Sequence, residues 1–219
     1  MPNILLINPN SSHATTEMMV RIAQADAPAG FTVVGVTASG GPSMIVNETE
    51  LQAAAVEVER VWRSASVPCA GVIISAFGDP GVDQVRALSG ATPVVGICES
   101  SMLEAAEGGR RFGVATVTPD LVDAIDAKAR QLGLGELYTG VRLTPGEPRA
   151  LTAHPQSLED ALAVATQECL NEGAQAVIIG GGPLGQAAVS LSKRFDMPLI
   201  APISAAVRRL GRQMAAATA

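Results

Sequence analysis

The sequence has few of the residues on which common catalytic and binding sites depend. Of its 219 residues, aromatic ones make up 3%, and histidine occurs only at His13 and His154. The three cysteines form no CxxC pair and have no histidine beside them, so neither a disulfide framework nor a zinc site is indicated. There is no Walker loop, and no GxGxxG follows a predicted strand. The sequence therefore predicts no metal site and no nucleotide site of a known pattern.

Charge and hydropathy argue against two further classes of partner. The net charge is −6, and the basic pairs Arg110–Arg111 and Arg208–Arg209 are isolated, which does not favour nucleic-acid binding. No apolar run approaches the ~20 residues that span a membrane. The N-terminus lacks the basic and long apolar regions of a signal peptide. We expect a cytoplasmic protein that binds neither nucleic acid nor membrane.

What the sequence has in abundance is small and aliphatic residues. Hydrophobic residues make up 47% of the chain and 22 residues are glycine, while short β-branched runs alternate with longer amphipathic stretches. This pattern is typical of an α/β protein with mostly parallel sheets covered by helices. The predicted strands are 3–7, 31–37, 70–75, 93–97, 112–117, 137–143, 175–179 and 198–201. The predicted helices are 13–26, 48–64, 81–88, 100–108, 119–131, 158–172, 184–194 and 203–216.

A repeat lies inside this alternation. The Val-Ile-Ile runs at 72–74 and 177–179 lie 105 residues apart (177 − 72), and Pro93 and Pro198 have the same separation. The repeat predicts two pseudo-symmetric lobes, the first made of residues 1–100 plus 203–219 and the second of residues 101–202. Ligands usually bind outside the carboxyl ends of parallel strands, so we expect a site in a cleft between the lobes.

Four strand-to-helix junctions carry the glycine and polar residues expected in such a cleft. They are INPNSS (7–12), SAFGDPG (75–81), TVTPD (116–120) and GGGPLG (180–185). Glycine lets a ligand approach backbone N–H groups, which can donate to a carboxylate or imide oxygen. Structural interpretations stay open for each junction. Ser11 or Ser12 can cap a helix, Asp79 suits a turn, and Thr116 and Thr118 are good strand formers.

Two groups that can titrate follow the strand predicted at 93–97. Cys98 and Glu99, in VVGICESS, are the only thiol and carboxylate that lie together near a predicted edge of the cleft. A reactive thiol needs a lowered pKa, and no basic residue lies close to Cys98 in sequence. Cysteine is also among the most commonly buried residues. We therefore interpret Cys98 as a small core residue first and as a nucleophile second.

The same segments, in the same order, resemble the aspartate/glutamate/hydantoin racemase family. The segments are LLINPNSS, IISAFGDPG, PVVGICES, GVATVTPD and AVIIGGGPLG, and the resemblance runs from Asn3 to about Arg208. INPN together with FGDPG is similar to the hydantoin/allantoin racemase branch. The resemblance implies two α/β lobes around one site, and racemisation without metal, pyridoxal or other cofactor. In such enzymes two cysteines face each other across the acidic carbon of the substrate. One thiolate removes the α-proton, and the opposite thiol returns one.

The sequence departs from the family at these two cysteines, which fall on Ala76 and Gly181. Neither residue can transfer a proton, so the two-thiol mechanism does not carry over. Glu99 matches a glutamate near the site in the wider family and is the remaining ionisable catalytic candidate, ahead of Cys98. The residues expected to contact substrate are Asn8, Asn10, Ser11, Ser75, Ala76, Phe77, Gly78, Thr116, Thr118, Gly180, Gly181, Gly182 and Pro183.

The sequence thus favours a racemase-family enzyme that acts on a small amino acid, a hydantoin or a related carboxylic or imide substrate. It would use a base other than cysteine, or a water held by the loops. Two alternatives stay open. One is a decarboxylase, isomerase or hydrolase of a small acid in the same pocket, and the other is a non-catalytic small-molecule binding protein. We also expect a homo-oligomer, because apolar residues face outward on the predicted helices.

Overall fold

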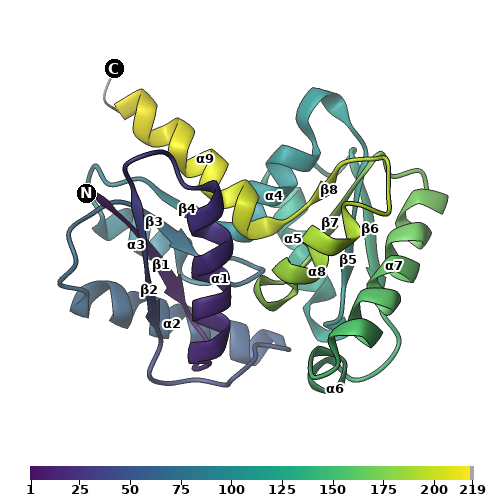
Figure 1. The fold of residues 1–219 in the computed structure, drawn as a ribbon, viewed down its shortest axis with the longest axis horizontal. Helices are drawn as coiled ribbons and strands as arrows, with labels where there is room; N and C mark the ends of the chain where they lie inside the picture. Colours follow the sequence, from purple (N-terminus) through teal and green to yellow (C-terminus); the bar gives the residue numbers. More distant parts are fainter. Residues whose placement is uncertain (218–219) are drawn as a thin grey trace.

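The computed structural model describes residues 1–217, which form two four-stranded parallel sheets side by side (Figure 1). The first sheet has the order β2 (Thr32–Thr37), β1 (Asn3–Asn8), β3 (Cys69–Ile74), β4 (Val94–Gly96). The second has the order β6 (Tyr138–Leu143), β5 (Phe112–Thr116), β7 (Ala176–Ile179), β8 (Leu199–Ile200). All strand pairs in both sheets are parallel. The predicted α/β fold with two parallel sheets is therefore confirmed.

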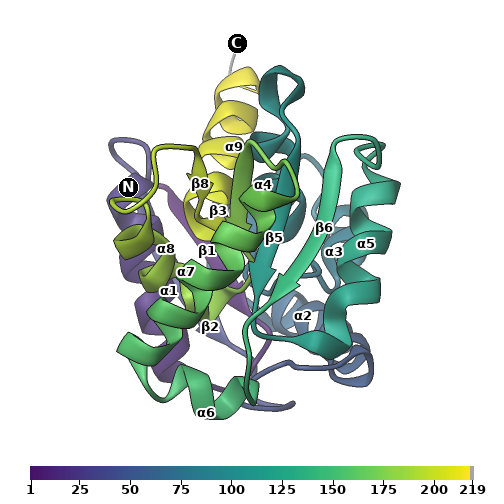
Figure 2. The same cartoon turned by 90° about the vertical axis from the view of Figure 1, so that its right-hand side faces the viewer.

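The helices follow the predicted ranges closely, with one addition. They are α1 (His13–Asp26), α2 (Glu48–Ser64), α3 (Val82–Leu88), α4 (Ile97–Ala105), α5 (Val122–Gln131), α6 (Pro148–Thr152), α7 (Pro155–Asn171), α8 (Gly185–Leu191) and α9 (Pro202–Ala217). The short helix α6 was not predicted, because five residues are too few to show a helical period. In the second lobe, α7 crosses the sheet over β5 while α5 lies beside β6 (Figure 2).

The 105-residue repeat corresponds to equal strand register in the two sheets. Val72 pairs with Val94 in the first sheet, and Val177 pairs with Leu199 in the second. A backbone hydrogen bond next to each pair is also repeated. The Val72 N–H donates to the Pro93 carbonyl in the first sheet, and the Val177 N–H donates to the Pro198 carbonyl in the second. The two loops that follow β3 and β7 therefore leave their sheets at equivalent positions.

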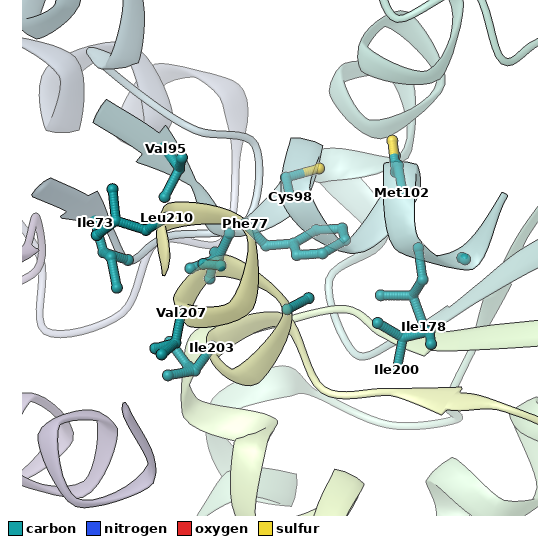
Figure 3. Packing of buried hydrophobic residues seen from close by; sticks show 14 of the residues in the cluster. Ile73, Phe77, Val95, Cys98, Met102, Ile178, Ile200, Ile203, Val207 and Leu210 are labelled. Carbon is teal, nitrogen blue, oxygen red and sulfur yellow. The ribbon is translucent and has the colours of Figure 1, made fainter. Parts of the chain in front are cut away.

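One hydrophobic cluster joins the lobes. Phe77, from the loop after β3, lies in the middle of this cluster, between residues of the first sheet and residues of the second (Figure 3). The labelled neighbours are Ile73 and Val95 on one side and Ile178 and Ile200 on the other. Helix α9 packs on β3, β4, α1 and α4, which places it with the first lobe. The domain boundaries at 100 and 202 stay a prediction, and residues 218–219 of the segment 203–219 lie outside the described residues.

No helix within residues 1–217 combines the length and the apolar character needed to cross a membrane.

Candidate functional site

A narrow pocket lies between the loops at the carboxyl ends of the two sheets. It offers about 40 Å³ to the centres of water molecules, inside an opening of about 470 Å³ that extends into solvent. A buried water needs at least ~10–15 Å³ by this measure, so the pocket takes a compact ligand or a few waters. Both lobes contribute to its wall. The lining residues are Asn10, Met44, Ile45, Ser75, Ala76, Phe77, Val117, Thr118, Leu121, Gly180, Gly181, Gly182, Pro183 and Leu184.

The first wall is positioned by a buried asparagine pair. Asn8 ends β1 and donates from Nδ2 to Asn10 Oδ1 (2.9 Å) and to Thr16 Oγ1 (2.9 Å). In return, the Asn10 N–H donates to Asn8 Oδ1 (3.1 Å). Asn8 thus fixes the turn, whereas Asn10 lines the pocket. The Ser11 N–H donates to the Pro42 carbonyl (3.0 Å), so Ser11 holds the loop after β2 and does not line the pocket.

The second wall is the loop after β3. Ser75 Oγ donates to the Ile7 carbonyl (2.8 Å), which ties the loop to β1. Gly78 has φ of +109°, a conformation that favours glycine, and it is not among the residues that line the pocket. The backbone N–H groups of Ala76 and Phe77 have no hydrogen-bond partner among the described residues, although both residues are buried. Unpaired buried donors are uncommon, so these two are available to a ligand in the pocket.

The second lobe supplies the facing loops. Thr116 Oγ1 donates to the Gly180 carbonyl (2.6 Å) and lies 3.3 Å from Thr118 Oγ1, so Thr116 supports the loop while Thr118 lines the pocket. The N–H of Gly181 also lacks a partner within residues 1–217. A Cβ on Gly182 would lie 2.9 Å from the Ser75 carbonyl oxygen, so glycine there lets the two loops approach each other.

Ala76 and Gly181 both line the pocket, one from each lobe. None of the described residues that line it carries a carboxylate, thiol, imidazole or amine. The pocket therefore presents amide, hydroxyl and backbone donors around an otherwise apolar space. It contains no side chain that exchanges a proton near neutral pH.

The ionisable candidates lie outside this lining. Both Cys98 and Glu99 fall in the first turn of α4, which begins at Ile97, three residues earlier than predicted. Glu99 Oε1 accepts the Gly96 N–H (3.3 Å) and pairs with Arg86, while Arg209 Nε lies 3.9 Å away. Burial, and then repulsion from Asp79, raises the pKa of the Cys98 thiol well above its ordinary value. Neither residue lines the pocket, and a catalytic role for either stays a prediction.

Asp79 is a buried carboxylate on which sequence reasoning placed little weight. Its two oxygens accept the N–H groups of Cys98 and Glu99 at 2.7 Å each, so Asp79 caps α4 from the loop after β3. Lys128 of the second lobe lies 3.9 Å from Oδ2. Burial, and then repulsion from Glu99, raises the pKa of Asp79 to about 7. The loop is thereby fixed to α4 and, through Lys128, to the second lobe.

The sequence did not predict five of the lining residues. Met44 and Ile45 come from the loop after β2, and Val117, Leu121 and Leu184 are apolar neighbours of predicted positions. Met44 and Ile45 could have been predicted from the sequence, because β2 is parallel to β1 and its carboxyl end lies at the same edge of the sheet as the pocket. Conversely, Asn8, Ser11, Gly78 and Thr116 support the wall without lining it.

The structure is an α/β protein with two parallel sheets and a pocket between the loops at their carboxyl ends. Residues 4–210 match the family model described as Asp/Glu/Hydantoin racemase, and the chain belongs to that family.

Relatives cover nearly the whole chain. The sequence is 30% identical over 210 residues to a hydantoin racemase of Paenarthrobacter aurescens, covering 94% of this chain and 88% of that protein. The structure resembles the allantoin racemase from Klebsiella pneumoniae, with a TM-score of 0.89, 26% identity, and coverage of 99% and 89%. Arylmalonate decarboxylase shares the fold, with a TM-score of 0.65, 16% identity, and coverage of 97% and 92%.

Proposed function

We propose that the interlobe pocket binds a compact carboxylate or cyclic imide, such as a small amino acid or a hydantoin, and that the two-thiol proton transfer is absent. The observation that carries this proposal is the set of unpaired N–H groups at Ala76, Phe77 and Gly181, around a pocket without ionisable side chains.

Backbone donors fixed in two facing loops suit a planar ligand with carbonyl oxygens on opposite sides. Each N–H would gain a partner on binding. Ala76 and Phe77 are buried and Gly181 is partly buried, and a buried donor without a partner costs about 1–3 kcal/mol.

Asn10 adds a donor, because its Oδ1 already accepts from Asn8 Nδ2 and the Ser12 N–H and leaves Nδ2 for the ligand. The Thr118 hydroxyl adds a group that can donate to or accept from an imide. The relation to hydantoin racemases supports the same ligand class.

Turnover is the second candidate function, in the form of racemisation by a base other than cysteine. The same N–H groups would stabilise the enolate that forms when the α-proton leaves, since donors aimed at developing negative charge lower the barrier. Because Ala76 and Gly181 cannot hold that proton, a water between the loops would carry it. We therefore expect proton exchange much slower than a pair of thiols would give.

One set of measurements distinguishes ligand binding alone from racemisation. Titration with hydantoin and with small amino acids, followed by calorimetry, should show saturable binding to the purified chain. Incubation of enantiopure ligands in deuterated water then reports exchange at the α-carbon by proton NMR. Saturable binding without exchange supports a binding protein, whereas binding with exchange supports an altered racemase. The absence of binding by every carboxylate and imide contradicts both.

Decarboxylation or hydrolysis in the same pocket would change the mass of the ligand, which racemisation does not. Mass spectrometry of the same incubations therefore distinguishes these reactions. We also propose that the chain works without a cofactor, in the cytoplasm and as a homo-oligomer. Light scattering of the purified chain tests the assembly.

A further inference from the structure

The loop between β2 and α2, residues 38–47, closes the pocket from the first lobe, and we call it the cover segment. Its two neighbouring apolar residues reach opposite lobes. Ile45 belongs to a cluster with Ala54 and Ala76 of the first lobe. Met44 packs on the hydrophobic cluster of the second lobe, which contains Leu158 and Leu184. The cover segment therefore spans the cleft through the Met44 side chain.

A second cavity lies on the outer side of Met44, and we call it the outer cavity. It is larger than the interlobe pocket, with an empty volume of about 950 Å³ against about 470 Å³, and both spaces open to solvent. Its lining residues are Ser12, Ala14, Thr15, Met18, Ser43, Met44, Arg149, Thr152, Leu158 and Pro183. Met44 and Pro183 are the two residues shared with the lining of the interlobe pocket. These two side chains therefore stand between the cavities.

We propose that Met44 determines ligand size at this site, because its side chain separates the interlobe pocket from the outer cavity. The inference rests on the proposed function. With Met44 in place, the ligand is limited to a compact carboxylate or imide. When the partition is opened, a substituent on the α-carbon extends into the outer cavity. The hydroxyls of Thr15 and Thr152 and the apolar side chain of Met18 suit an aromatic or aliphatic group with a polar end.

A contact from the other lobe holds the partition in place. Arg149 of α6 approaches the Met44 carbonyl (3.5 Å) and Glu50 of α2 (3.4 Å). Glu50 also accepts the Val46 N–H (2.8 Å), so one carboxylate connects the cover segment, α2 and α6. Methionine is flexible and fills irregular space, and its position here is set by the backbone that Arg149 and Glu50 hold.

The test compares Met44→Ala with Met18→Ala, a matched control that removes a methionine side chain lining the outer cavity but not the interlobe pocket. Dissociation constants for hydantoin and for 5-benzylhydantoin are measured by calorimetry on each folded variant. We expect the wild-type chain to prefer hydantoin. Met44→Ala should shift the ratio of the two constants towards 5-benzylhydantoin by at least about tenfold, the effect of a methylene-sized change in an apolar pocket. Met18→Ala should leave the ratio within about threefold of wild type, well below that effect.

Two outcomes would overturn the inference. One is a folded Met44→Ala that binds hydantoin with an unchanged ratio, and the other is an equal shift in Met18→Ala. If Met44→Ala does not fold, Met44→Leu provides the test, since methionine-to-leucine exchanges are well tolerated in cores and leucine is shorter. It should give a smaller shift in the same direction, and an unchanged ratio refutes the partition. Failure of the proposed function differs, because the wild-type chain would then bind none of the carboxylates or imides.

Discussion

Placing thiols at Ala76 and Gly181, where the resemblance predicts the two family cysteines, should create racemase activity in this chain. Ala76 and Gly181 line one pocket from opposite lobes. If they face the two sides of a bound hydantoin, one thiolate can remove the α-proton and the other thiol can return one to the opposite face. The double variant Ala76→Cys/Gly181→Cys, which keeps Met44, is therefore expected to interconvert the enantiomers of a compact hydantoin with a small α-carbon substituent, such as 5-methylhydantoin.

The structure gives different costs for the two substitutions. Ala76 already has its Cβ, so only a sulfur enters the pocket. A Cβ at Gly181 would lie 3.0 Å from Leu184 Cγ and 3.1 Å from its Cδ1, so that buried side chain must move aside. Gly181 has φ of 161°, which is extended and adds no backbone strain. Overpacking of this kind costs about 1–3 kcal/mol of folding stability. We expect the double-cysteine variant to exchange the α-proton about 10²–10⁴-fold faster than the parent chain, the usual contribution of general acid–base catalysis.

Circular dichroism of an enantiopure hydantoin follows the racemisation, and proton NMR in deuterated water follows the exchange. The matched control is Ala76→Ser/Gly181→Ser, which adds side chains of similar size without a thiol. Each single cysteine variant should exchange the α-proton on one face and preserve configuration. A folded double-cysteine variant that binds hydantoin but exchanges no faster than the serine control would refute the opposed placement of the two loops.

Two further predictions concern the support of the pocket. Gly182→Ala should lower the free energy of unfolding by about 1–3 kcal/mol and weaken ligand binding, because the new Cβ would meet the Ser75 carbonyl oxygen at 2.9 Å. Urea denaturation measures the loss, and unchanged stability would contradict the close approach. For Asp79, the pKa rises from 3.8 to about 7 on folding, so between these values the folded chain holds a proton that the unfolded chain releases. Stability should therefore fall as pH rises through this window, by up to about 1.4 kcal/mol per unit. In Asp79→Asn this pH dependence should disappear. If the urea midpoints of the wild-type chain and of Asp79→Asn change equally with pH between 4 and 8, Asp79 is not the source of the pH dependence.

The fold could be predicted because its signals are local or repeated in the sequence. β-branched runs alternating with amphipathic stretches located all eight strands near their observed positions. The equal spacing of two strand pairs then indicated two similar lobes, since equal spacing produces equal register, as in Val72–Val94 and Val177–Leu199. Glycine-rich loops at strand ends identified most of the pocket wall, because parallel strands present their carboxyl ends at one edge.

The roles of individual polar residues could not be predicted in the same way. Asn8 and Asn10 are alike in sequence, but one supports the turn and the other lines the pocket. Helix α4 begins directly after β4, and Cys98 and Glu99 are therefore held in its first turn, away from the pocket lining. That placement depends on Asp79, 20 residues before Glu99, which accepts the free N–H groups of the helix.

The sequence by itself determined the α/β fold with two parallel sheets and the location of the cleft, because strand patterns and motif positions are linear properties of the chain. Only the tertiary structure decided which residues enclose the pocket. Met44 and Ile45 reach it from a loop without a chemical motif, and Arg149 holds that loop from the opposite lobe. Such contacts join residues about 100 positions apart, and burial across the cleft leaves no periodic signal in either segment.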